Sequence, residues 1–269
     1  MDGFSLPARQ KPDKKKSKKE QPVTIVAGNT GMLIDAKKEA ITGNIEGARD
    51  LFRRYVSRFP EDPVGYFELA RIESSQRNPD EAIRLCSEAA RLDPGNIWYS
   101  LFLAELYQGT SRLPEAADIY EKIVERNSDN PDYMYQLASL YLQLEKYREA
   151  IRIYDRIEEN TGVSEEVSVQ KEKIYLHLND LKGAENEVQK LILAYPDETR
   201  YQSILAEFYI SNNMPDKALA MYQRIAAADP DNAYIHMSMA DYYRKTGNKE
   251  KAFEELKLGF ANANLDVDT

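Results

Sequence analysis

The side chains of this sequence that are best able to do chemistry are two histidines, one cysteine and pairs of adjacent glutamates such as Glu158-Glu159 and Glu165-Glu166. His177 and His236 fall in different parts of the chain. Neither belongs to an H-x-x-x-H or H-E-x-x-H motif, in which two imidazoles on one helix face bind zinc. We therefore predict that both histidines lie on the surface or between helices, and that the chain has no metal site.

The pairs Glu158-Glu159 and Glu165-Glu166 have the residue type needed for general acid-base chemistry. Glu165 and Glu166 follow Ser164 at a predicted helix start, where negative charge offsets the helix dipole. The sequence contains no G-x-x-x-x-G-K, G-x-G-x-x-G or G-x-S-x-G motif. The chain is therefore predicted not to be an enzyme, with no catalytic residue and no cofactor.

Charge is unevenly distributed along the chain. The full sequence carries −9 at pH 7, whereas residues 1–20 alone carry +4, which leaves −13 on the rest. An acidic body repels phosphate backbones, so no nucleic-acid partner is expected. Residues 1–28 show no helical apolar period and are predicted to be a disordered basic arm, either a solvated tail or a contact for an anionic surface. No stretch has the ~20 apolar residues of a membrane span.

The sequence is consistent with more than one cellular compartment. The segment 4–8 resembles the end of a secretory signal whose apolar stretch is missing. The cytoplasm and, if a signal has been removed, the periplasm or cell envelope are both consistent with it. Cys86 is the sole cysteine, which excludes an intrachain disulfide framework but does not identify the compartment.

The elements that must position any functional side chain follow a 34-residue period. Alanine recurs at this interval at Ala48, Ala82, Ala116, Ala150, Ala184, Ala218 and Ala252. Parallel ladders hold Ala36, Ala70, Ala104, Ala138, Ala206 and Ala240, then Tyr107, Tyr141, Tyr175, Tyr209 and Tyr243, then Pro60, Pro94, Pro196 and Pro230. Such a period indicates a helix-turn-helix array. Because closely crossing helices need a small residue at the crossing, the alanines are predicted to be packing positions.

Over residues 29 to about 260 the sequence resembles the tetratricopeptide repeat family, as a multi-repeat protein of the bacterial type. The family pattern sets a large apolar residue, a small residue, Tyr, Ala, an aromatic residue and Pro at fixed offsets. The resemblance implies an all-α, right-handed superhelical α-α solenoid of about seven 34-residue helix-turn-helix repeats. These repeats are expected at 29–62, 63–96, 97–130, 131–164, 165–198, 199–232 and 233–260, with a tail at 261–269.

Cap and turn residues agree with the repeat. Asp62-Pro63, Asn78-Pro79 and Asn130-Pro131 each combine a side-chain acceptor at a helix N-cap with proline at the first helical position. Gly43-Asn44 and Gly247-Asn248 predict tight turns between helices, because glycine tolerates positive φ.

Some positions depart from the pattern. Cys86 stands where the repeat has a buried aromatic or aliphatic residue, so it is predicted to be a small core hydrophobe. Lys171 and Glu172 replace a large apolar and a small residue, which predicts looser packing and a bend or hinge near 160–175. After Phe260 no polar capping helix follows, so the last face is expected to be covered by a partner chain or by further residues of a longer protein.

The family resemblance also implies a ligand groove lined by the leading helix of each repeat. The family's contact offsets name Lys37, Phe67, Arg71, Trp98, Leu101, Glu105, Tyr135 and Ser139 in the first four repeats. In the other repeats they name Lys173, His177, Arg200, Glu207, Tyr234, Met237 and Asp241. The first half is the more persuasive site, since aromatic residues and Arg dominate interface energies. Trp98 could instead pack against the next helix, because Tyr99 competes with it for the inward position.

The same resemblance limits the ligand chemistry. Some family members grip a chaperone tail carboxylate with a defined set of Lys, Asn and Arg. At such offsets the first two repeats here have Leu33 and Lys37, then Val64, Phe67 and Glu68, and no other run of repeats matches better. An apolar or aromatic peptide is therefore predicted, with an acidic flank for Lys37 and Arg71.

We predict a non-catalytic protein–protein interaction scaffold that binds a peptide or protein segment in this groove. One alternative is a structural or oligomerisation section of a larger cell-envelope protein, with a homo-oligomer formed through the uncapped C-terminal face at Phe253 and Leu256. Another is the recruiting module of an enzyme whose catalytic part lies outside this chain.

Overall fold

The computed structural model describes residues 30–262, which are helical apart from short turns and contain no strand. Contacts divide the chain into two compact units, with the division between Asp93 and Pro94. The predicted basic arm at 1–28 and the signal-like segment 4–8 lie outside the described residues, as does the predicted tail beyond Asn262. Among the described residues, no helix is long and apolar enough to cross a membrane.

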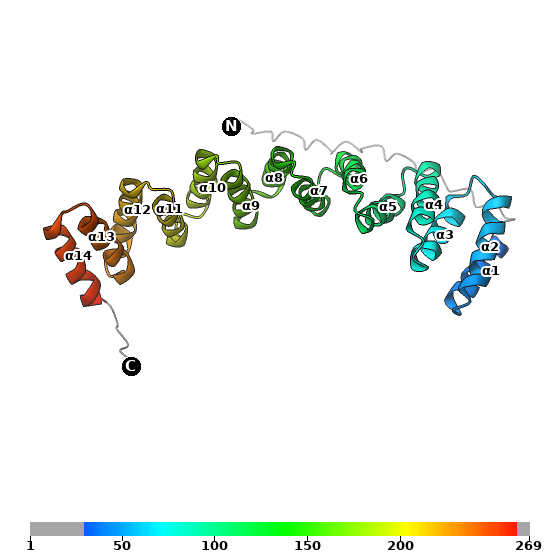
Figure 1. Ribbon diagram of the computed structural model, residues 1–269, viewed down its shortest axis with the longest axis horizontal. Coiled ribbons are helices and arrows are strands. Elements are labelled where there is room, and N and C mark those ends of the chain that lie inside the picture. Colours follow the sequence, from blue (N-terminus) through cyan, green and yellow to red (C-terminus); the bar gives the residue numbers. More distant parts are fainter. Residues whose placement is uncertain (1–29, 263–269) are drawn as a thin grey trace, which may run out of the picture. The chain divides into compact units, whose positions relative to one another are not determined.

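Each unit is built from helix pairs joined by short turns (Figure 1). The first unit contains α1 (Thr30–Ile41), α2 (Ile45–Arg58), α3 (Pro63–Ser75) and α4 (Pro79–Leu92). The second contains α5 (Ile97–Gly109), α6 (Leu113–Arg126), α7 (Pro131–Gln143), α8 (Tyr147–Thr161), α9 (Glu165–His177), α10 (Leu181–Ala194), α11 (Thr199–Ser211), α12 (Pro215–Ala228), α13 (Ala233–Lys245) and α14 (Lys249–Asn262). Within a unit each helix packs against its neighbours along the chain, so each unit is an all-α repeat solenoid.

We call the odd-numbered helices the leading helices and the even-numbered ones the trailing helices. Two of the predicted caps start leading helices as expected. At α3 and α7 the side-chain oxygen of Asp62 or Asn130 accepts a hydrogen bond from the second backbone N–H after it, at 3.0 and 2.9 Å. The trailing helix α4 has Asn78 at its N-cap and begins at Pro79, as predicted, but the predicted side-chain cap hydrogen bond of Asn78 is wrong. The Asn78 amide instead donates to Glu73 Oε2 at 3.1 Å, because a buried carboxylate lies within its reach.

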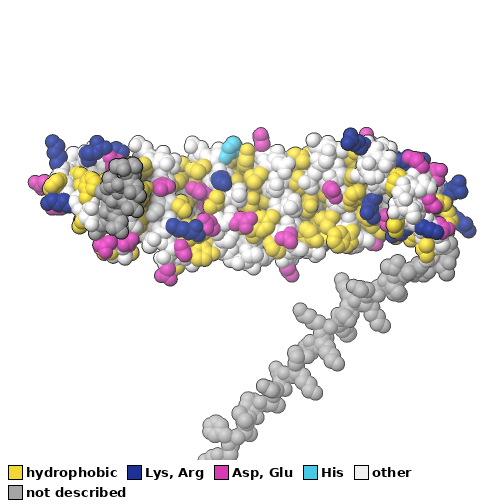
Figure 2. Space-filling model, turned by 90° about the horizontal axis from the view of Figure 1, so that it is seen from below, with side chains coloured by type: hydrophobic (Ala, Val, Ile, Leu, Met, Phe, Trp, Pro, Cys, Tyr) yellow, Lys and Arg dark blue, Asp and Glu magenta, His cyan; other side chains and the backbone are white. Residues whose placement is uncertain are grey.

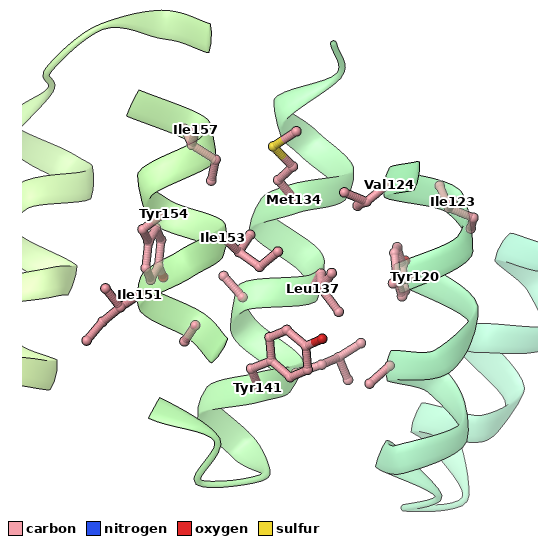
Figure 3. Close-up of a cluster of buried hydrophobic side chains, with 14 of the residues drawn as sticks. Tyr120, Ile123, Val124, Met134, Leu137, Tyr141, Ile151, Ile153, Tyr154 and Ile157 are labelled. Atoms are coloured by element: carbon pink, nitrogen blue, oxygen red, sulfur yellow. The ribbon is translucent and has the colours of Figure 1, made fainter. Parts of the chain in front are cut away.

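The alanines of both ladders are buried, each with 7% or less of its surface exposed. This burial lets neighbouring helices approach closely and brings large side chains into the seams between them. In Figure 3, Val124 of α6 and Leu137 of α7 share one seam, whereas Ile153 of α8 faces α7 and Ile151 points away from it. Burying a side chain such as Leu137 contributes about 1.5–3 kcal/mol.

The turn inside each helix pair contains one residue in the left-handed region. Gly43 and Gly247, both predicted turn residues, have φ of 86° and 83°. At the same place in the other five pairs, φ lies between 57° and 60° at Arg77, Ser111, Glu145, Asn179 and Asn213. All seven positions are spaced by 34 residues, so the turn geometry repeats even where glycine does not. A non-glycine residue in this conformation costs about 1–2 kcal/mol.

Replacing the exposed Glu145 by glycine should therefore stabilise the second unit. Relief of the strain at φ 57° is partly offset by the greater chain entropy of glycine in the unfolded state, which leaves a gain of about 0.5–1 kcal/mol. Urea denaturation of the full chain measures this gain. Glu145→Ala is the matched control, since alanine keeps the strain, and equal stability of both variants would contradict the assignment.

The sequence predicts looser packing around Lys171, but the position of this side chain itself is filled. The side chain is fully buried on α9, and its ammonium lies 2.6 Å from Asp155, 2.8 Å from Glu158 and 3.0 Å from Glu187. Burial acts to lower the pKa of Lys171, but hydrogen bonds with Asp155 and Glu158 outweigh it and raise the pKa above its usual range. Carboxylates of α8 and α10 thus replace the apolar contacts that leucine makes in other repeats.

Candidate protein-interaction surface

The predicted groove residues all lie on leading helices. Lys37 is on α1, Phe67 and Arg71 on α3, Trp98, Leu101 and Glu105 on α5, and Tyr135 and Ser139 on α7. Because the first three belong to the first unit and the others to the second, each group is described by itself. Figure 2 shows the molecule from below the view of Figure 1, the side on which α5, α7 and α9 lie below their partners α6, α8 and α10. Hydrophobic side chains reach the surface there in patches, with acidic and basic side chains between them.

In the first unit, Glu68 brings the two predicted cations together. Lys37 Nζ lies 3.0 Å from one carboxylate oxygen of Glu68, and Arg71 Nη1 lies 3.2 Å from the other. These three side chains line a depression of about 440 Å³ together with Ile41 and Ile72. Glu68 leaves the trio with one net positive charge, which is less than the sequence suggested for binding an acidic flank.

In the second unit, Trp98 is a surface residue. It is 71% exposed near the start of α5, whereas Tyr99 is only 6% exposed. Tyr99 therefore takes the inward position, and the alternative of an inward-packed Trp98 is excluded. Leu101 is half-buried against the core of this unit, and Glu105 is exposed.

The remaining predicted residues offer only part of their surface or a small polar group. Tyr135 is half-buried, with its ring edge-on to that of Tyr154 at a centroid distance of 6.4 Å. Burial raises the pKa of Tyr135. Ser139 is exposed and accepts a hydrogen bond from Gln143 at 3.4 Å. Phe67 is half-buried on α3.

A depression of about 580 Å³ lies between α11 and α13, outside the eight residues chosen for the first half. Tyr234 and Met237 on α13 are 59% and 41% exposed, and Ile210 on α11 is 47% exposed. Tyr222 of the trailing helix α12 also lines it and is buried. The family offsets had named Tyr234 and Met237, but the sequence alone held no reason to prefer them to Trp98.

Charged groups lie at one side of this depression. The carboxylate of Asp241 accepts hydrogen bonds from Lys245 Nζ at 2.7 Å and from Arg244 Nη2 at 2.5 Å. Its hydrogen bond with Lys245, and then that with Arg244, holds the pKa of Asp241 below its usual range. Asp241 and Lys245, which line the depression, balance each other, and Arg244, bonded to Asp241 from outside the lining, adds one positive charge.

The cysteine and the histidines have structural settings. Cys86 is fully buried, and burial raises the pKa of its thiol to about 12, so the thiol is protonated at neutral pH. His236 lies between α13 and α14, with Nδ1 2.7 Å from Glu255 and Nε2 2.8 Å from the Pro230 carbonyl. Burial acts to lower the pKa of His236, but these two contacts raise it overall. His177 is exposed at the end of α9, so the predicted settings of both histidines and of Cys86 are confirmed.

One glutamate of each predicted pair is held in an ion pair. Glu158 contacts Lys171 and Lys190, and Glu165, at the start of α9, accepts a hydrogen bond from Arg200 at 2.6 Å. Within residues 30–262, no group of three or more His, Cys, Asp or Glu side chains could hold a metal ion.

Comparison with known proteins agrees with the repeat architecture. One tetratricopeptide repeat model matches residues 74–133 and 109–169, and a second matches residues 42–97, 173–233 and 209–259. No curated protein matches the chain significantly.

Three of the solved structures that resemble this chain differ in how much of each chain the match covers. A tetratricopeptide repeat protein from Parabacteroides merdae ATCC 43184 is 18% identical, with 88% of this chain and 94% of that chain covered and a TM-score of 0.47. A chain in the structure of Naa15/Naa10 bound to HypK-THB is 14% identical, with 88% of this chain and 37% of that chain covered and a TM-score of 0.60. MamA from Desulfovibrio magneticus RS-1 is 16% identical, with 77% and 97% covered and a TM-score of 0.38. The likeness to the chain in the Naa15/Naa10 structure shows a shared fold.

Proposed function

Since this chain belongs to the tetratricopeptide repeat family, we propose that it is a non-catalytic scaffold that binds a peptide or protein segment on its leading helices. The residue types able to do chemistry support the non-catalytic part of this proposal. Cys86, His236 and Glu158 are held in packing or ion-pair contacts inside the fold.

The observation that carries the proposal is the exposure of large apolar side chains on leading helices. Trp98 on α5 and Tyr234 on α13 are 71% and 59% exposed, although buried core residues lie within one or two positions of each. Aromatic side chains held on a rigid helix are the usual anchors of protein interfaces, because they bury much area at little entropic cost. The proposal assigns contact with the ligand to these side chains.

The depression between α11 and α13 indicates the ligand chemistry. Ile210, Tyr234 and Met237 form an apolar wall that fits an aromatic or large aliphatic side chain. Lys245 and Arg244 beside it outnumber the single carboxylate of Asp241, so an acidic residue next to the apolar anchor is favoured. The groove residues Trp98, Leu101, Glu105, Tyr135 and Ser139 would contact a second part of a longer ligand.

Selection of displayed random peptides of about 12 residues, which span roughly 40 Å when extended, tests this proposal on the full chain. We expect selected peptides to carry an aromatic or large aliphatic residue with an acidic neighbour. The double variant Tyr234→Ala/Met237→Ala should weaken their binding by at least about 30-fold, since two anchors each contribute about 1 kcal/mol or more. Fluorescence of Trp98, the sole tryptophan, gives a second readout for peptides that bind near α5.

Leu193→Ala is the matched control, because Leu193 is 82% exposed on the trailing helix α10. Its peptide binding should equal that of the unchanged chain. Peptides whose binding is lost in Leu193→Ala but kept in both Trp98→Ala and the Tyr234/Met237 variant would contradict a ligand surface on the leading helices.

A further inference from the structure

Helix α14 exposes two phenylalanines at positions that face the following helix elsewhere in the chain. Phe253 and Phe260 are 60% and 57% exposed. Counted back in steps of 34 residues, Phe253 corresponds to Ile151 of α8, and Phe260 corresponds to Val124 of α6. Ile151 is 8% and Val124 is 1% exposed. In Figure 3 Val124 lies in the seam with α7, and Ile151 points away from α7 on the far side of α8.

Leu258, the third large apolar residue exposed on α14, lies on a different face of the helix. Leu258 is 45% exposed, and the same counting aligns it with Lys122, which is exposed on α6. Its position is therefore a solvated one in the repeat. The two faces of α14 can thus be separated: Phe253 and Phe260 lie on the stacking face, and Leu258 does not.

Helix α1 of another copy is a poor partner for this stacking face. On α1, Asp35 and Lys38 are exposed at the positions that correspond to Leu137 and Leu140 of α7, each 1% exposed. Stacking α14 of one molecule on α1 of the next would remove both charges from water, which is strongly unfavourable. Head-to-tail growth is therefore disfavoured, and a contact between two α14 faces does not carry this penalty.

The charges of α14 are balanced, unlike those of the whole chain. The helix carries three lysines and three glutamates: Lys249, Glu250, Lys251, Glu254, Glu255 and Lys257. The full chain has a net charge of −9 and would repel a copy of itself over most of its surface. Helix α14, which is neutral as a whole and has interspersed signs, is the exception, because antiparallel helices related by a two-fold axis can set lysines against glutamates.

We propose that the stacking face of α14 binds α14 of a second copy of this chain across a two-fold axis. Phe253 and Phe260 of each copy would form the apolar centre of this contact, with Lys249, Glu250 and Lys257 around it. Lys257 Nζ lies over the Phe253 ring, 4.5 Å from its centre, and the ring is still 60% exposed. A contact across a two-fold axis is isologous, which means that both copies use the same face. The assembly therefore ends at the dimer.

One helix face per molecule is smaller than a standard interface of about 800 Å² per partner. The dimer should therefore be weak and reversible, with a dissociation constant on the order of 10 µM. Sedimentation velocity of the full chain, from about one-tenth to ten times that concentration, should show a reversible shift from monomer to dimer. Phe253→Glu/Phe260→Glu should weaken the dimer by at least about 100-fold.

Leu258→Glu is the control for an added carboxylate, because it places one on the solvated face of α14; it should dimerise like the unchanged chain. A second measurement does not depend on the glutamate variants folding normally. With Cys86 buried, a short bismaleimide should link Lys257→Cys into a covalent dimer but should not link Leu193→Cys on α10. A chain that stays monomeric at every concentration, a dimer that survives Phe253→Glu/Phe260→Glu, or equal cross-linking at both cysteines would overturn the proposal.

Discussion

Lys171→Met should lower the free energy of unfolding of the second unit by about 3–5 kcal/mol. Methionine keeps the length of the lysine stem but removes the ammonium that three carboxylates surround. The side chains of Glu187 and Glu158 are only 4% and 11% exposed, so water cannot replace the lost cation. Lys190, which contacts the same two glutamates, is 39% exposed and compensates only in part.

Urea denaturation of the full chain, followed by circular dichroism, measures the effect of Lys171→Met. Lys173→Met on the same helix is the matched control, since Lys173 is exposed, and it should change stability by less than about 0.5 kcal/mol. Adding Glu158→Gln and Glu187→Gln to Lys171→Met should recover most of the loss, because neutral amides no longer repel one another. Undiminished stability of Lys171→Met alone would show that the ion pairs do not hold α8, α9 and α10 together.

Glu73→Ala should lower the stability of the first unit by about 2–3 kcal/mol. Glu73 on α3 is 2% exposed, and its carboxylate lies 3.2 Å from Arg49 and 3.4 Å from Arg53 of α2. It also accepts the hydrogen bond from Asn78 at the start of α4. Removing it leaves the guanidinium of Arg49, 16% exposed, without its buried counter-charge.

Hydrogen exchange of the full chain suits this test, because repeats of a solenoid can open separately. Protection should fall in α2, α3 and α4 of Glu73→Ala. The control is Glu88→Ala, which removes a surface pair with Arg91 and should cost about 0.5 kcal/mol or less. Protection that falls equally in both variants would mean that the buried ion pairs of Glu73 stabilise the unit no more than the surface pair of Glu88 does.

Glu73 also shows how far the repeat pattern can be read. It occupies the place of tyrosine in the ladder that includes Tyr141, whose hydroxyl donates to Glu121 of the preceding trailing helix at 2.5 Å. At Glu73 the polarity is reversed, with the acceptor on the leading helix and the donors Arg49 and Arg53 on the trailing helix. The sequence shows that Glu73 interrupts the tyrosine ladder and that Arg49 and Arg53 precede it. It does not show that the two guanidinium groups lie within reach of the Glu73 carboxylate.

The groove residues illustrate the same limit. The offsets placed Lys37 and Arg71 on leading helices, yet the carboxylate of Glu68 that lies between them became evident only from the distances. Likewise, the sequence left Trp98 and Tyr99 as competitors for one inward position. A change of one residue turns a helix by about 100°, so small differences in helix rotation decide which of two adjacent aromatic side chains is buried.

The sequence by itself determined the repeat, the helix pairs, the buried alanines and the family, because helix packing imposes the same local requirement every 34 residues. The tertiary structure alone decided which charges are paired inside the fold, as at Lys171 and Glu73, and where exposed apolar side chains gather, as at Tyr234. Both outcomes depend on distances between side chains of different helices. Periodicity predicts which helices are neighbours, but the rotation and approach of each pair decide which atoms meet.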